Sequence, residues 1–254
     1  LASLKQALLV APADRRRYTN LIQLSLRSGD ADSAVLYAEE AAKAFPKLLE
    51  FNFFKALALG ESGRHEEAVK VFEVVQVEAG ISRPEILNGD FYFSYGVSAE
   101  QAGRYVKAAE ALRKSIELDP AKAPRAWNYL GYMWADRGEN LDEAEALIRR
   151  AVDSEPDNGA YLDSLGWVYF KKGLHAQAYK ELIRVIEILK ADDSVVFDHL
   201  GDACEKLGKT AEAVTYWQKA LQLDAGNASI AAKIDARASR VAQKPEASKK
   251  SDSP

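Results

Sequence analysis

Apolar side chains recur every three or four residues along almost the whole chain, with polar residues between them. In the last such segment, Ile230, Ile234, Ala238 and Val241 fall on a single stripe of a helix. No stretch of useful length alternates apolar and polar residues with the period of two that marks a half-buried strand. The pattern therefore predicts an all-α protein.

A glycine separates these helical segments at nearly constant intervals. The gaps between successive glycines are 34, 40, 35, 35 and 35 residues for Gly29, Gly63, Gly103, Gly138, Gly173 and Gly208. Each glycine follows one helical stretch and precedes another. Glycine suits a tight turn between two helices because it adopts positive φ at little cost. The spacing predicts six helical hairpins.

Small residues stand at two fixed distances from these turns. The residue seven positions before the turn is Ala56, Gly96, Gly131, Gly166 or Gly201, and Ile22 is the exception in the first segment. The residue five positions after it is Ala34, Ala68, Ala108, Ala178 or Ala213, with Ala144 shifted by one because of an extra residue near Asn140. Small side chains allow paired helices to approach closely, and larger ones would overpack the contact at roughly 1–3 kcal/mol. Prolines end the second helix of several segments; these are Pro12, Pro46, Pro120 and Pro156.

This combination resembles the tetratricopeptide-repeat (TPR) family. The fourth segment carries the resemblance in Trp127-Asn128-Tyr129-Leu130-Gly131, Ala144, Ile148, Ala151 and Pro156. The fifth carries it in Leu162-Asp163-Ser164-Leu165-Gly166, Tyr169, Gly173 and Ala178. The resemblance covers residues 1 to about 225 and implies a right-handed α-solenoid of helical hairpins, the TPR superhelix.

Four regions follow from this organisation. Residues 1–14 are expected to form the second helix of a truncated leading repeat, and residues 15–225 the six hairpins. Residues 226–243 are expected to form a capping helix that starts at Asn227 and closes the exposed end of the solenoid. Residues 244–254 lack an apolar anchor and should be disordered. Gly80, Pro84 and Asn88-Gly89 predict a loop within an insert at 76–90.

Composition and charge exclude several classes of function. The net charge is -4 and the pI about 5.6, which argues against a nucleic-acid-binding surface. No apolar run approaches the roughly 18 residues that span a bilayer, so we expect a soluble cytoplasmic or periplasmic protein. The chain starts at Leu1 rather than at methionine, so either a signal segment has been removed or this is a fragment. Cys204 is the only cysteine, which excludes an intrachain disulfide framework and a cysteine-rich metal site.

Candidate catalytic motifs are weak. Gly208-Lys209-Thr210 resembles the end of a phosphate-binding loop, but Ala203 stands where that loop needs a glycine. His65 and His175 are equivalent positions of different repeats, and no histidine or cysteine pair has metal-ligand spacing. We therefore expect no catalytic centre, no metal and no cofactor.

A second stripe of each first helix is the better candidate for function. Residues ten, six and three before the turn glycine share one helical face, and the TPR resemblance assigns that face to the concave groove. The stripe consists of Phe93, Val97 and Glu100; Asn128, Tyr132 and Ala135; Asp163, Trp167 and Phe170; and Asp198, Asp202 and Glu205.

Two interpretations of this stripe remain open. Either Tyr132, Trp167 and Phe170 pack against neighbouring repeats, or they form an exposed aromatic floor. Clustered exposed aromatics usually mark a binding site. In the second case Asp163, Asp198 and Asp202 form an acidic rim beside His199, which favours a partner with a basic flank, and the Asn128 amide pairs with the backbone of an extended peptide.

The sequence thus predicts a non-enzymatic scaffold or adaptor that docks a partner protein or peptide in its concave groove. The TPR resemblance includes bacterial arrays, among them adaptors at the cell envelope. One alternative is a filament- or cytoskeleton-associated array of the kinesin-light-chain kind, although the units of that family are longer than the spacing here. The other is the regulatory arm of a larger enzyme. The oligomeric state is left open.

Overall fold

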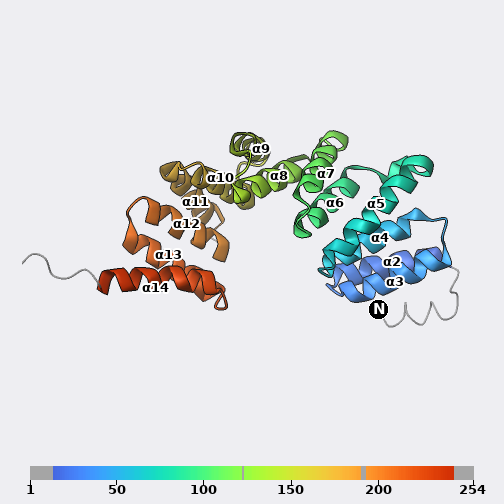
Figure 1. Ribbon diagram of the computed structural model, residues 1–254, viewed down its shortest axis with the longest axis horizontal. Helices are drawn as coiled ribbons and strands as arrows, with labels where there is room; N and C mark the ends of the chain where they lie inside the picture. Colours follow the sequence, from blue (N-terminus) through green and yellow to red (C-terminus); the bar gives the residue numbers. More distant parts are fainter. Residues whose placement is uncertain (1–13, 122, 190–192, 243–254) are drawn as a thin grey trace, which may run out of the picture. The chain divides into compact units, whose positions relative to one another are not determined.

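The computed structural model describes residues 14–121, 123–189 and 193–242, and this part of the chain contains helices and no strand (Figure 1). The all-α prediction is confirmed. The elements are α2 (Arg15–Arg27), α3 (Ala31–Ala44), α4 (Leu49–Glu61), α5 (His65–Ser82), the 3-10 turn η1 (Pro84–Ile86), α6 (Gly89–Gln101), α7 (Tyr105–Leu118), α8 (Ala123–Arg137), α9 (Leu141–Ser154), α10 (Gly159–Lys171), α11 (His175–Leu189), α12 (Ser194–Lys206), α13 (Thr210–Leu223) and α14 (Ala228–Ala242).

The chain divides into two compact units, Leu1–Ala126 and Trp127–Pro254, here called the N-terminal and C-terminal units. Within each unit, each helix packs on the helices next to it in sequence, as an α-solenoid requires. The expectations for residues 1–14 and 244–254 lie outside the described residues, except at Asp14. Its side chain caps α2 by accepting a hydrogen bond of 3.0 Å from the backbone N–H of Arg16. None of the described helices is long and apolar enough to cross a membrane.

The six turn glycines adopt the backbone conformation for which they were singled out. Their φ angles lie between 70° and 78°, and a Cβ atom at any of them would meet no atom within 4 Å. Backbone conformation, not crowding, therefore requires glycine at these turns.

The small residues seven positions before the turns face the paired helix at very short range. A Cβ atom at Gly166 would lie 2.6 Å from Leu182 Cγ, and one at Gly201 would lie 2.3 Å from Trp217 Cδ1. The alanines that follow the turns are completely buried. The two helices of each hairpin therefore approach as closely as the pattern predicts.

The insert between the second and third hairpins differs from the prediction. Residues 76–82 belong to α5, which has 18 residues where α3 and α7 have 14, so the expected loop is mostly helix. Gly80 costs the helix only about 1 kcal/mol relative to alanine. The helix ends at Arg83 because the ring of Pro84 disfavours helical geometry in the preceding residue. In this additional helical turn of α5, Val77 is 67% exposed and Ile81 is 86% exposed.

The last helix, α14, packs on α13 as a capping helix should. Asn227 caps it by accepting a hydrogen bond of 3.2 Å from the Ile230 N–H, and Ile230 itself is buried. Ion pairs attach α14 to α12: Lys233 Nζ lies 2.7 Å from Asp198 Oδ1 and from Asp202 Oδ1. The helix is therefore held by apolar and by charged contacts.

Candidate functional site

The structure brings part of the predicted groove together in the C-terminal unit. The Trp167 ring stacks on Phe170 of the same helix, α10, at a centroid distance of 5.1 Å. On α12, His199 stacks on Trp167 at 4.1 Å with an interplanar angle of 16°. These three rings form one layered cluster across α10 and α12.

Trp167 is nevertheless only 9% exposed, so the expectation of an exposed aromatic floor is wrong at this residue. Its Nε1 donates a hydrogen bond of 3.2 Å to Asp136 Oδ1 of α8. The Nζ atom of Lys171 lies 4.8 Å from its ring centroid. The alternative interpretation, packing against the neighbouring repeats, describes Trp167, because its side chain is long enough to contact both flanking first helices.

The side chains of the expected acidic rim pair with other residues of the chain. Asp163 is 9% exposed, and its Oδ1 lies 2.9 Å from Nδ1 of the buried His199. Asp198 and Asp202 both bind Lys233, and Trp217 Nε1 donates a hydrogen bond of 3.0 Å to Asp202. Burial raises the pKa of Asp202, while the Lys233 ammonium acts in the opposite direction. The carboxylates are therefore engaged within the chain, not solvated as expected.

Three predicted groove residues, Asn128, Tyr132 and Phe170, remain half-buried. The Asn128 Oδ1 atom is inaccessible and has no hydrogen-bond partner among the described residues. Phe170 keeps one side of the stacked cluster accessible. These positions are the part of the predicted site whose exposure still suits a contact surface.

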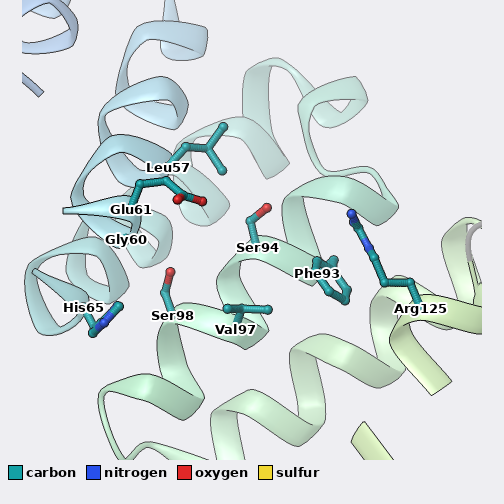
Figure 2. A pocket seen from close by; sticks show the side chains of 9 residues that line it. All are labelled: Leu57, Gly60, Glu61, His65, Phe93, Ser94, Val97, Ser98 and Arg125. Carbon is teal, nitrogen blue, oxygen red and sulfur yellow. The ribbon is translucent and has the colours of Figure 1, made fainter. Parts of the chain in front are cut away.

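A cavity in the N-terminal unit offers a more open site, with a volume of about 370 Å³ (Figure 2). It lies between α4 and α6, and one residue each from the start of α5 and the start of α8 also lines it. The lining residues are Leu57, Gly60, Glu61, His65, Phe93, Ser94, Val97, Ser98 and Arg125. Figure 2 shows Glu61 and His65 on one side of the cavity and Arg125 on the opposite side, with the two serines between them.

The sequence contained a signal for part of this cavity. Phe93 and Val97 belong to the predicted groove stripe of the third segment. Leu57 and Gly60 stand six and three residues before Gly63, at the same stripe positions of the second segment. Extending the stripe by one repeat would have found them. The other lining residues lie beside the stripe or on the next helix, where this rule does not reach.

The polar groups of the cavity are largely without partners. Neither Ser94 nor Ser98 has a side-chain hydrogen bond to any described residue, although Ser98 is only 5% exposed. In His65, Nδ1 is inaccessible and equally unpartnered within the described part of the chain. Arg125 places its Cζ atom 3.7 Å from the ring centroid of Phe93. The cavity thus combines an apolar floor with two serine hydroxyls that have no partner within the described part of the chain.

A second hollow, of about 660 Å³, lies on the side formed by α5, α6 and α7. Its floor contains Tyr95, whose hydroxyl lies 3.5 Å from Glu73 Oε1, and Glu73 also pairs with Lys107. Burial raises the pKa of Tyr95 to about 12. Since these polar groups are already paired with one another, this hollow is a weaker candidate than the α4–α6 cavity.

Metal or thiol chemistry finds no support in the described residues. No group of three or more histidine, cysteine, aspartate or glutamate side chains among them is placed to hold a metal ion. Cys204 is buried, and burial raises the pKa of its thiol to about 11, which makes it a poor nucleophile.

Comparison with known families covers nearly the whole chain. A tetratricopeptide-repeat model matches residues 1–84, 87–123, 121–158 and 135–194, and a second model of the same description matches residues 195–227. The chain belongs to the tetratricopeptide-repeat family. TPR proteins are typically scaffolds for protein binding.

Two curated TPR relatives come from Pseudomonas aeruginosa. The TPR repeat-containing protein PA4667 is 30% identical over 179 residues, which cover 70% of this chain and 29% of the relative. The type IV pilus assembly protein PilF is 27% identical over 143 residues, which cover 56% of each chain. This chain therefore spans less than two thirds of the length of either relative.

Among solved structures, a TPR protein from Parabacteroides merdae aligns with a TM-score of 0.69 at 21% identity. The alignment covers 92% of this chain and 89% of that chain. At this level of identity the likeness concerns the TPR fold alone.

Proposed function

We propose that this TPR chain is a non-enzymatic scaffold that binds an extended segment of a partner protein in the α4–α6 cavity. The observation that carries the proposal is the set of unpartnered polar groups in that cavity, beside an accessible apolar floor. In the C-terminal unit, by contrast, Asp163 pairs with His199, and Asp198 and Asp202 pair with Lys233. PilF is named for the assembly of type IV pili, and a role in assembling other proteins agrees with a scaffold.

The spacing of the two serines supports an extended ligand. Ser94 and Ser98 are four residues apart on α6, which corresponds to a rise of about 6 Å. In an extended chain, backbone groups on the same side repeat about every 6.6 to 6.8 Å. The two hydroxyls can therefore bind successive backbone groups of one peptide lying along α6, while Leu57, Phe93 and Val97 contact its side chains.

The C-terminal unit has a supporting role in this proposal. Its buried cluster of Trp167, His199 and Asp163 stabilises the stack of helices. Half-exposed Phe170 and Tyr132, with Asn128, form a proposed second contact surface. This surface has no proposed contact with a basic flank of the partner, because Asp198 and Asp202 already pair with Lys233.

Selection of displayed random peptides on the purified chain tests the proposal. Val97→Arg places a long charged side chain in the cavity, and Val106→Arg makes the same change at a 75% exposed position of α7 that does not line it. We expect wild type and Val106→Arg to enrich one family of peptides that Val97→Arg does not retain. Far-UV circular dichroism checks that both variants fold.

A conservative variant that is less able to disturb folding provides a second test. Ser98→Ala removes only the hydroxyl, and we expect it to weaken the selected peptides by about fivefold, the value of one neutral hydrogen bond. If Val97→Arg and Ser98→Ala retain the same peptides with wild-type affinity, the cavity is not the binding site.

A further inference from the structure

The charges at the two ends of the α4–α6 cavity define the chemistry of its ligand. We infer that the partner segment carries a basic group at the Glu61 end, an acidic group at the Arg125 end, and an apolar side chain between them. This inference rests on the proposed function of the same cavity. It specifies which extended segment the cavity recognises. The proposed function states only that the cavity binds an extended segment.

The Glu61 end carries uncompensated negative charge. Glu61 is exposed at the last position of α4 and forms no ion pair with a described residue. Its neighbours Glu66 and Glu67, which do not line the cavity, pair with Arg104 and Arg64. The carbonyl end of a helix is itself partly negative, and α4 has no basic residue in its last turn to offset it. A cation from the ligand would supply the missing charge.

His65 also lines this end of the cavity. Its Nδ1 atom is inaccessible and has no hydrogen-bond partner within the described part of the chain. An ammonium or guanidinium group of the ligand has several donors. Such a group can therefore satisfy the Glu61 carboxylate with more than one donor, whereas the inaccessible Nδ1 of His65 takes no part.

The Arg125 end has the opposite character. Arg125 stands in the first turn of α8, a helix end that is partly positive and carries no acidic residue in that turn. Its guanidinium carbon lies 3.7 Å from the Phe93 ring centroid, and its Nη2 atom lies 3.6 Å from Asp90 Oδ1. The side chain is still 54% exposed. A planar guanidinium held in this way can bind a carboxylate with two parallel hydrogen bonds.

The distance between the two ends sets the spacing of the ligand charges. Phe93 and Ser98 mark the two ends along α6 and are separated by a rise of about 7.5 Å. This corresponds to about two residues of extended chain. The charged side chains of the ligand add their own length to this distance. A segment in which one or two apolar residues stand between an acidic and a basic residue therefore fits the cavity.

Synthetic peptides of defined charge test this inference. The probes are fluorescein-labelled, acetylated and amidated Ser-Glu-Leu-Leu-Lys-Ser, its reversed order Ser-Lys-Leu-Leu-Glu-Ser, and the neutral Ser-Gln-Leu-Leu-Gln-Ser. Fluorescence anisotropy with the full chain measures each affinity at low and at physiological salt. We expect one charged order to bind about tenfold more tightly than the neutral peptide at low salt, with a smaller preference at higher salt.

Charge reversal locates the effect. Glu61→Lys should lose the preference for the basic residue and gain one for a peptide with glutamate at both charged positions. Arg125→Glu should lose the preference for the acidic residue and gain one for a peptide with lysine at both charged positions. Glu117→Lys is the control for Glu61→Lys, because it makes the same change in net charge at a position of α7 outside the cavity. This control should keep the wild-type preference.

The outcomes separate the two proposals. Equal affinity for charged and neutral peptides, with binding still abolished by Val97→Arg, would overturn the charge pattern and leave the binding site intact. A change in preference with Glu117→Lys as large as with Glu61→Lys would also overturn it. Peptide binding that is indifferent to Val97→Arg would refute the proposed function itself.

Discussion

Replacement of Gly201 by alanine tests the closest helix contact in the C-terminal unit. A Cβ atom at this position would lie 2.3 Å from both Cδ1 and Nε1 of Trp217, across the α12–α13 hairpin. Carbon atoms normally approach to about 3.5–4.0 Å, so the indole would have to move by more than an ångström. Trp217 is 3% exposed and its Nε1 donates a hydrogen bond to Asp202, which leaves the ring little room to move.

The expected loss follows from three contributions. Overpacking of a buried contact costs about 1–3 kcal/mol, and the upper part of this range applies because a ring must shift. Displacing the indole weakens its hydrogen bond to Asp202, at a cost of about 1 kcal/mol. Alanine in place of glycine stabilises a helix interior by about 1 kcal/mol. The net prediction is that Gly201→Ala lowers the free energy of unfolding by about 2–3 kcal/mol.

Two glycine controls separate crowding from backbone strain. Gly226→Ala meets no atom within 4 Å and has no positive φ, so it should change stability by less than about 0.5 kcal/mol. Gly208→Ala also has open space, but its φ of 75° should cost about 1 kcal/mol. In the Gly201→Ala background, Trp217→Leu should cost less than in wild type, because the smaller side chain relieves the crowding.

Urea unfolding followed by circular dichroism gives the stability of each variant. Because repeat arrays can unfold in parts, hydrogen exchange of the α12 and α13 amides reports on the hairpin itself. If Gly201→Ala matches Gly226→Ala in both measurements, close approach at the small positions does not limit this fold, and the packing argument fails.

Three further predictions follow from the structure. Gly80→Ala should raise the free energy of unfolding by about 0.5–1 kcal/mol if α5 is helical through this position, since a new Cβ would make only an ordinary contact of 3.9 Å with Leu87; an unchanged urea midpoint would favour the loop first expected there. Because burial raises the pKa of Cys204 to about 11, its reaction with Ellman's reagent at pH 8 should be far slower in the native chain than in urea, and equal rates would contradict its burial. Lys233→Met leaves Asp198 and Asp202 without their cation and should destabilise the chain by about 1–3 kcal/mol at neutral pH. Burial already raises the pKa of Asp202, and loss of the Lys233 ammonium raises this pKa further. The folded variant therefore takes up a proton and regains stability as the pH falls through the pKa of Asp202. Urea midpoints that show the same deficit relative to wild type at pH 7 and near pH 5 would refute this coupling.

The hairpins were predictable because their constraints are local. A turn with φ near 75° accepts few residues other than glycine, and a contact at 2.6 Å from a neighbouring side chain leaves no room for a larger residue. Both requirements repeat with the structural unit and therefore appear in the sequence as spacing. The α5 extension was not predicted because Gly80 and Pro84 are typical turn residues, and they outweighed the helical periodicity of this segment. The buried positions Phe72, Val75 and Ala79 continue the helical stripe up to Gly80.

The groove was only partly predictable, because exposure depends on residues of other repeats. Trp167 and Val97 stand at the same stripe position, six residues before their turn glycines, yet one is buried in a cluster and the other lines a cavity. Three residues before the turn, the fifth repeat has Phe170, which stacks on Trp167, whereas the second repeat has Gly60 on the floor of the cavity. Phe170 packs on the inner face beside Trp167, whereas Gly60 lets α6 approach so closely that a Cβ atom would lie 3.0 Å from Ser98 Oγ. Gly60 therefore marks a close approach of α4 and α6 beside the cavity, which the aromatic residues along the stripe do not reveal.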